Sequence, residues 1–178
     1  MKKIYYGRAV YDHKEINAVL KVLKNNSLSL TDGKNVKQLE KIVSKMFGKK
    51  YGLMVNSGSS ANLLALFCAI NPLRKNHLNR GDECLVPAIC WSTTLWPIVQ
   101  AGLTPKILDV NMHNFSLDLN TIKKNITKKT KAIMIVNVLG NCAEMDKIRR
   151  FANKKKLILI EDNCESLGSV YKNKKLGT

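Results

Sequence analysis

The sequence predicts an α/β fold, a three-layer α/β/α arrangement in which helices cover both faces of a mostly parallel sheet. Two observations support this fold class. Apolar stretches of strand length alternate with stretches of helix length along most of the chain. Small turns rich in Gly, Ser, Asn or Asp separate them. Such alternation is typical of parallel sheets, because a parallel pair of strands needs a crossover helix between them.

Residues 1–50 are expected to form an N-terminal helical segment of the domain. Apolar residues at helical spacing predict a helix from Asp12 to Leu23, with Asp12 as its N-cap. A second helix is expected from Asn35 to Phe47, because Gly48 is a typical stop. The polar stretch between these helices contains Asp32-Gly33, which indicates a turn.

From Tyr51 onward, strands and helices are expected to alternate. The predicted strands are Tyr51–Val55, Glu83–Pro87, Pro105–Val110, Lys131–Leu139 and Leu157–Ile160. The predicted helices are Ala61–Ile70, a helix after Ser92 that ends near Ala101, Asn120–Ile126 and Glu144–Lys154. Ligands of open parallel sheets bind beyond the carboxyl ends of the strands, so chemistry is expected there.

The composition excludes several classes of protein. No apolar run approaches the roughly 20 residues needed to span a bilayer, and the basic N-terminus lacks the apolar core of a secretory signal. The five cysteines are odd in number and form no metal-binding pattern, so they are expected to be reduced thiols of a cytoplasmic protein that binds no metal.

The net charge of +17 raises the possibility of nucleic-acid binding. The lysines, however, are scattered in short groups at element ends and are interleaved with Asn. No aromatic and basic stripe offers a stacking platform for bases. We therefore expect a solvated basic surface and no nucleic-acid partner; a nucleic-acid-binding module is a rival interpretation that rests on charge alone.

The turn from Asn56 to Ala61 is the first candidate site. Gly58 permits a tight turn, and Ser59 and Ser60 stand where unpaired N–H groups open a helix. Such an N-terminus attracts phosphate through its dipole and its free donors. An ordinary capped turn between a strand and a helix fits the same spacing equally well.

Trp91, just after the Glu83–Pro87 strand, is the second candidate. Its large flat ring can stack on an aromatic cofactor beside a phosphate site. Taken alone, a Trp in an apolar context is more often a core residue.

The third candidate is the acidic end of the last predicted strand, Glu161-Asp162-Asn163-Cys164-Glu165. An acid there can pair with a ring nitrogen and keep it protonated, although it can also be solvated or cap a helix. A phosphate cradle, a stacking ring and a carboxylate for a pyridinium nitrogen are the three grips that pyridoxal phosphate requires. Their conjunction predicts a site for this cofactor.

Over nearly its whole length, from about Gly7 to Thr178, the sequence resembles the DegT/DnrJ/EryC1/StrS sugar aminotransferases and dehydratases, which have the aspartate-aminotransferase fold. The similarity follows the order and spacing of the motifs above. It also includes Ser29 to Gly33, which resembles the family's substrate-side loop. The resemblance implies that Ser59 and Ser60 hold the phosphate, Trp91 covers the pyridine ring and Asp162 pairs with the ring nitrogen.

Within the family, the motifs look most like the nucleotide-sugar 3-dehydratases. These enzymes use the pyridoxamine phosphate form of the cofactor on a nucleotide-linked 4-keto-6-deoxyhexose, in making 3-deoxy sugars for surface polysaccharides such as lipopolysaccharide O-antigen. Glu165 stands where the family's transaminases usually carry Gln or His, and it is the candidate catalytic residue here. An aminotransferase of the same family is the closest rival, and a non-catalytic fragment is another.

The residue that separates the two chemistries, a Lys in the aminotransferases and a His in the dehydratases, lies beyond Thr178 in the family. The resemblance implies that residues 51–178 are part of the cofactor-binding large domain, that the C-terminal small domain is absent, and that the complete enzyme is a homodimer. We expect this chain alone to bind the cofactor weakly at best and to turn over no substrate.

Overall fold

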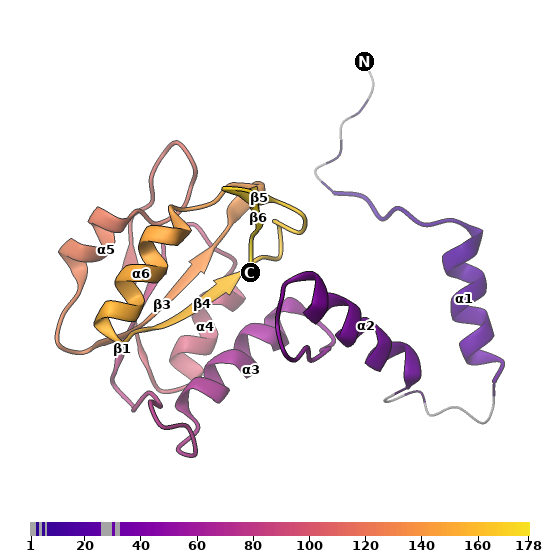
Figure 1. The fold of residues 1–178 in the computed structure, drawn as a ribbon, viewed down its shortest axis with the longest axis horizontal. Coiled ribbons are helices and arrows are strands. Elements are labelled where there is room, and N and C mark those ends of the chain that lie inside the picture. Colours follow the sequence, from indigo (N-terminus) through magenta and orange to yellow (C-terminus); the bar gives the residue numbers. More distant parts are fainter. Residues whose placement is uncertain (1–2, 4, 6, 26–29, 31–32) are drawn as a thin grey trace.

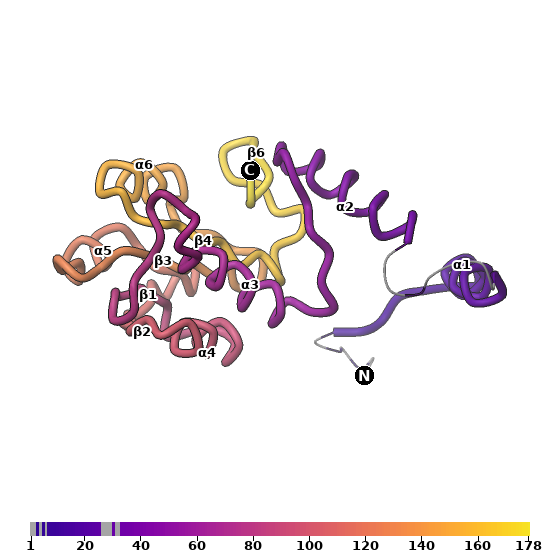
Figure 2. Tube along the Cα trace, turned by 90° about the horizontal axis from the view of Figure 1, so that it is seen from below, coloured from indigo at the N-terminus to yellow at the C-terminus, as the bar shows by residue number. Residues whose placement is uncertain are grey.

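A computed structural model describes residues 3, 5, 7–25, 30 and 33–178 of the chain (Figure 1). The larger part of these residues forms a body of sheet and helices, and α1 (His13–Leu23) lies away from this body in both views (Figures 1 and 2). Of the loop that resembles the family's substrate-side loop, residues 29, 31 and 32 lie outside the described residues.

The body is built on a sheet of four parallel strands: β1 (Glu83–Pro87), β2 (Thr104–Leu108), β3 (Thr130–Val136) and β4 (Ile158–Asp162). Their order across the sheet is β2-β1-β3-β4, and every neighbouring pair is parallel. The predicted parallel sheet is confirmed. The register pairs Val136 with Asp162 and Pro87 with Leu108, so the carboxyl ends of the strands lie along one edge.

Helices cover both faces of this sheet, which confirms the three-layer fold. One face carries α3 (Gly58–Ile70) and α4 (Ser92–Gln100), and the other carries α5 (Leu119–Asn125) and α6 (Met145–Lys155) (Figure 1). β1, β3 and β4 contribute side chains to both layers, because successive side chains of a strand point to opposite faces.

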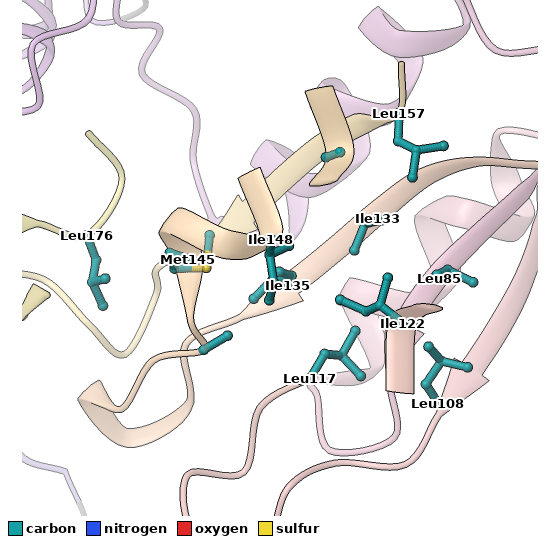
Figure 3. Packing of buried hydrophobic residues seen from close by; sticks show 12 residues of the cluster. Leu85, Leu108, Leu117, Ile122, Ile133, Ile135, Met145, Ile148, Leu157 and Leu176 are labelled. Atoms are coloured by element: carbon teal, nitrogen blue, oxygen red, sulfur yellow. The ribbon is translucent and has the colours of Figure 1, made fainter. Parts of the chain in front are cut away.

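The two cores are apolar and closely packed. Ile133 and Ile135 of β3 pack with Ile148 of α6 on one face (Figure 3), and the residue between them, Met134, joins the core under α3 and α4. These side chains have no exposed surface. Full burial of a side chain of this size contributes roughly 1.5–3 kcal/mol, so the sheet is a firm support for its loops.

The two N-terminal helices agree with the predicted ones to within a residue. Asp12 caps α1, since its carboxylate accepts the N–H of Lys14 while Glu15 accepts the N–H of Asp12 in return. The second helix, α2, runs from Lys34 to Met46. The apolar stripes of both helices are exposed (Ile16, Val19, Leu20 and Leu23; Leu39, Ile42, Val43 and Met46).

The predicted strand Tyr51–Val55 is wrong. The segment forms no strand, and the side chains of Tyr51 and Leu53 are 77% and 71% exposed. None of the described strands lies beside it, so its backbone has no ladder to join. Instead α2 holds it: the N–H of Met54 donates to Glu40 Oε1 at 2.8 Å, and Gly52 packs against the backbone of Glu40.

The predicted strand Lys131–Leu139 is too long, because β3 ends at Val136. A short 3-10 helix, η1 (Val138–Gly140), follows it, and Leu139 adopts a left-handed φ of 53° that no strand continues through. A small antiparallel hairpin of β5 (Val170–Tyr171) and β6 (Lys174–Lys175) was not predicted.

Replacing Ser57 by Ala is expected to lower the free energy of unfolding by about 1 kcal/mol. Ser57 is the N-cap of α3, and its hydroxyl oxygen accepts the N–H of Ser60 at 3.1 Å. Denaturant unfolding of both proteins measures the difference. Ser44→Ala is the control, because the Ser44 hydroxyl only donates back to Lys41 within α2. Equal effects of the two changes would show that the cap contributes nothing.

Candidate functional site

Polar groups from α3, α4 and the segment after β4 meet at the carboxyl edge of the sheet. The first turn of α3 lies beside the segment after β4, since a side chain at Gly58 would come within 4.0 Å of the Cys164 sulfur. The first turn of α4 is joined to α3, since the Ser59 hydroxyl donates to Thr93 Oγ1 at 2.9 Å. The candidate residues on these three segments therefore form one site.

The N-terminus of α3 presents donors to this site. Gly58, Ser59 and Ser60 form its first turn rather than the separate turn that was predicted. Ser57 accepts the Ser60 N–H, whereas the N–H groups of Gly58 and Ser59 have no hydrogen-bond acceptor among the described residues. Free N–H groups at the positive end of a helix dipole, beside serine hydroxyls, are suited to bind a phosphate group.

The Asp162 carboxylate is the most constrained polar group of the site. Its Oδ2 accepts Asn62 Nδ2 of α3 at 2.8 Å and Thr94 Oγ1 of α4 at 3.1 Å. Its Oδ1 accepts the N–H of Cys164 at 3.1 Å. Asp162 is half-buried and Thr94 fully buried. The carboxylate is thus fixed by donors from two helices and from its own strand end.

Glu165 joins the same edge to the end of β3. Its Oε2 accepts the N–H of Leu139 at 2.7 Å, within the left-handed turn of η1. Gly140 follows with φ of 79°, and a side chain there would come within 3.1 Å of the Ser169 hydroxyl. Glu165 itself is exposed. Its carboxylate therefore holds a strained loop in place.

Trp91 lies on the surface, so the interpretation of this residue as part of the core is wrong. It occupies the N-cap position of α4, and 74% of its surface is exposed. The Trp91 carbonyl accepts the N–H of Thr94, the residue whose hydroxyl donates to Asp162. A flat ring of this size that stays exposed at a polar site is available to a ligand.

The buried amide of Asn137 is hydrogen-bonded to the residue that follows the end of β4. Asn137 has no exposed surface, and its Nδ2 donates to Asn163 Oδ1 at 2.7 Å, next to Asp162. The Ser166 hydroxyl donates to the same oxygen at 2.9 Å. Asn137 Oδ1 has no partner among the described residues. A buried amide oxygen of this kind is costly to leave unpaired.

The negative charge of Asp162 affects the pKa of the neighbouring Cys90 thiol. Burial first, and the charge of Asp162 second, raise the pKa of Cys90 above its ordinary value. Burial raises the pKa of Cys84 in β1 to about 12.

No cluster of His, Cys, Asp and Glu among the described residues is arranged to hold a metal ion. Nor does the described part contain a helix of the length and apolarity that crossing a bilayer requires.

Sequence reasoning singled out Ser59, Ser60, Trp91, Asp162 and Glu165, and all five lie at this edge. It gave no role to the partners of these residues: Asn62, Thr93, Thr94 and Asn137. A signal was present for one of them, because Asn62 is a polar residue within the otherwise apolar helix Ala61–Ile70. The others are ordinary helix-start or strand-end residues.

A three-layer sheet domain with free N–H groups at a helix N-terminus and a fixed carboxylate at one strand edge is suited to bind a phosphorylated ring compound. The comparison with known proteins is specific. The chain belongs to the DegT/DnrJ/EryC1/StrS aminotransferase family, whose sequence profile matches residues 10–178. This confirms the family resemblance.

Among its relatives is the GDP-4-keto-6-deoxy-D-mannose 3-dehydratase of Yersinia pseudotuberculosis, 42% identical over 170 residues that cover 96% of this chain and 42% of the relative. The structure of the Escherichia coli enzyme of that activity, with bound hydrated PLP, superposes with a TM-score of 0.87 at 41% identity over 96% of this chain and 43% of the other. The GDP-perosamine synthase of Caulobacter vibrioides is 32% identical, over 94% of this chain and 43% of the synthase. The chain thus spans a little over two fifths of the length of these relatives.

Replacing Asp162 by Asn is expected to speed the alkylation of Cys90 at pH 8 several-fold. Loss of the negative charge lowers the pKa of this thiol, and the thiolate is the species that reacts. Iodoacetamide labelling, followed by mass spectrometry of the peptide that contains Cys90, measures the rate. Cys68 on the exposed side of α3 is the internal control. An unchanged Cys90 rate would contradict the electrostatic coupling.

Proposed function

We propose that the chain is the cofactor-binding part of a vitamin B6-dependent enzyme that removes the 3-hydroxyl group from a nucleotide-linked 4-keto-6-deoxyhexose. The observation that carries this proposal is the Asp162 carboxylate, fixed by three donors beside the free N–H groups of α3. The names of the relatives supply the reaction and substrate class. One relative is a lipopolysaccharide biosynthesis protein of Salmonella typhimurium, 40% identical over 84% of this chain, which supports a role in surface polysaccharide synthesis.

The residues present fit pyridoxal or pyridoxamine 5′-phosphate. Ser59 and Ser60, with the free N–H groups of the first turn of α3, have the donors and the dipole to bind the phosphate. The exposed ring of Trp91 has the size and position to cover the pyridine ring. Asp162 has an acceptor position left for the ring nitrogen. When bound, the cofactor would supply the amine for the sugar's C4 keto group and a pyridinium ring that withdraws electrons from the cofactor's own C4′ carbon, where a proton is removed as the C3 hydroxyl leaves.

The chain's own residues would then do three things. Asp162 keeps the ring nitrogen protonated, because an adjacent negative charge favours the charged form of the ring. Trp91 shields one face of the ring from water. Glu165, with its exposed carboxylate at the same edge, holds or moves a proton near the substrate, and its bond to the Leu139 N–H sets its position.

The second candidate function is a nucleotide-sugar aminotransferase of the same family. It is favoured by relatives whose names state amino transfer, among them the 3-oxo-glucose-6-phosphate:glutamate aminotransferase of Bacillus subtilis, 33% identical over 86% of this chain. The product separates the two: a dehydratase releases a 3-deoxy sugar, and an aminotransferase leaves an amino group on C4. The binding of the cofactor through Ser59, Ser60, Trp91 and Asp162 is common to both.

We also propose that the complete enzyme is a homodimer in the cytoplasm, with residues 1–50 as an N-terminal helical segment and 51–178 as part of the large domain. The exposed apolar stripes of α1 and α2 support a protein partner, because stripes of this kind are normally covered. All five cysteines are free thiols, as in proteins of a reducing compartment.

Asp162→Ala is expected to weaken binding of pyridoxamine 5′-phosphate at least tenfold, the scale of one hydrogen bond to a charged group. The assay uses the chain with Trp96→Phe, which leaves Trp91 as its only Trp, and follows quenching of Trp91 fluorescence. Glu144→Ala, an exposed acid at the start of α6, is the control. Equal affinities of Asp162→Ala and the unchanged protein would refute the assigned role.

Glu165→Gln is expected to lower kcat for dehydration about 100-fold, the scale of general acid–base catalysis. The assay joins this chain, after Thr178, to the C-terminal part of the Yersinia pseudotuberculosis dehydratase and measures release of the 3-deoxy sugar. Gln keeps an oxygen acceptor for the Leu139 N–H, but its amide does not accept or release a proton as a carboxylate does. Glu165→Leu removes both functions. If Gln is as active as Glu and only Leu is impaired, then Glu165 supports the loop and transfers no proton.

A further inference from the structure

The arrangement of donors around Asp162 goes beyond the pairing of one acid with one ring nitrogen. A carboxylate has about four positions at which it accepts hydrogen bonds, roughly two on each oxygen. Asn62 and Thr94 both donate to Oδ2, at 2.8 and 3.1 Å, and fill that oxygen. The Cys164 N–H takes one position on Oδ1 at 3.1 Å. One acceptor position on Oδ1 is therefore left.

We propose that Asn62 and Thr94 are positioning residues, a clamp that restricts Asp162 to a single N–H donor and so selects a ligand with one ring nitrogen. The clamp rests on the proposed function, because the ligand it selects is the proposed cofactor. The occupied Oδ2 excludes the bidentate pairing that a guanidinium or amidine makes with both oxygens of a carboxylate.

The clamp is well supported by its surroundings. Thr94 has no exposed surface, and its N–H is held by the Trp91 carbonyl at 2.9 Å, so its hydroxyl has little freedom to turn away. Asn62 comes from a different helix and also reaches the Thr93 carbonyl, at 3.5 Å. Two helices on one face of the sheet thus fix the carboxylate of a strand end from the same side.

The clamp also affects where the shared proton resides. As long as donors occupy the other positions of the carboxylate, the carboxylate competes poorly for the proton of the ring nitrogen. Without them, the side chain of Asp162 is free to rotate, and the charged pair with the ring is weakened. The expected effect of losing the clamp is a loss of selectivity for the ring nitrogen rather than a loss of fold.

The test compares two ligands of the full 178-residue chain: pyridoxamine 5′-phosphate and its analogue in which CH replaces the ring nitrogen. Their dissociation constants are measured by quenching of Trp91 fluorescence in the Trp96→Phe background. We expect the unchanged chain to prefer the natural ligand at least tenfold. In Asn62→Leu and Thr94→Val, which remove one donor each at nearly constant volume, this preference should fall several-fold.

Thr94→Ser is the conservative rescue, because it keeps the hydroxyl, and it should retain the preference. Asn153→Leu and Thr104→Val are matched controls at exposed positions of α6 and β2. Circular dichroism and thermal unfolding show whether each variant is folded, and Asn62→Leu at its half-buried position is the variant to use if Thr94→Val is not.

The possible failures are distinguishable. If the unchanged chain binds both ligands equally, the proposed pairing of Asp162 with a ring nitrogen is wrong and the clamp has no ligand to select. If its binding is too weak to measure, the same comparison is made by calorimetry on the chain joined after Thr178 to the C-terminal part of the Yersinia pseudotuberculosis dehydratase, where absence of binding refutes both proposals. If the unchanged chain shows the preference and the folded variants without a donor show it in full, the proposed function stands and the clamp is refuted.

Discussion

The contact of Asp162 with two helices is the interaction on which the rest of the site depends. The residue ends β4, and its donors begin or lie near the beginning of α3 and α4. The contact is possible because parallel strands end together at one edge, where α4 begins after β1 and where the first turn of α3 also lies. Each helix N-terminus brings free N–H groups and a positive dipole end to the same place. A sheet of parallel strands therefore collects negative ligands at this edge.

The site gains its rigidity from the core beneath it. Residues of β3 alternate between the two layers, and the strand is buried almost throughout. A strand anchored on both faces cannot tilt without opening two cores, so the strand end is fixed to within the tolerance of side-chain packing. The loops above it have a looser framework: the left-handed Leu139 is held by one carboxylate, that of Glu165. The apolar cores fix the position of the strand ends, and polar contacts such as that of Glu165 with Leu139 fix the conformation of the loops that follow them.

The fold was readable from the sequence because its signals are local. The alternation of strands and helices, the cap at Asp12 and the bounds of β1 all follow from neighbouring residues. The Tyr51–Val55 segment shows the limit: its apolar character is that of a strand, but a strand needs a neighbour in space, and no local pattern reveals whether one is there. Leu139 is a similar case, since its left-handed backbone is held by a residue 26 positions later.

The candidate site was readable only in part, for the same reason. Motifs at strand ends identified Asp162 and Ser59, whose types are suggestive in their own context. The partnership of Asn62 with Asp162 depends on the order of strands across the sheet, which the sequence does not state. Trp91 was predicted to be a ligand-stacking ring against the average tendency of Trp to be buried, and its position as the N-cap of α4 leaves the ring exposed. Residue-type tendencies give the average environment of a side chain, whereas the order of the strands decides which side chains meet in this fold.

The separation of 100 residues between Asn62 and Asp162 has a consequence for the synthesis of the chain. The ribosome releases the N-terminus of α3 and Trp91 long before β4, which carries the carboxylate, so the nascent chain holds one half of the candidate site while the other half is still being made. Closing a loop of this length costs about 4 kcal/mol in chain entropy, beyond a constant for closure itself. A compound that bridges the two halves rewards that closure. The presence of such a compound during translation would therefore favour correct docking of β4, because a ligand that binds only the folded state stabilises that state.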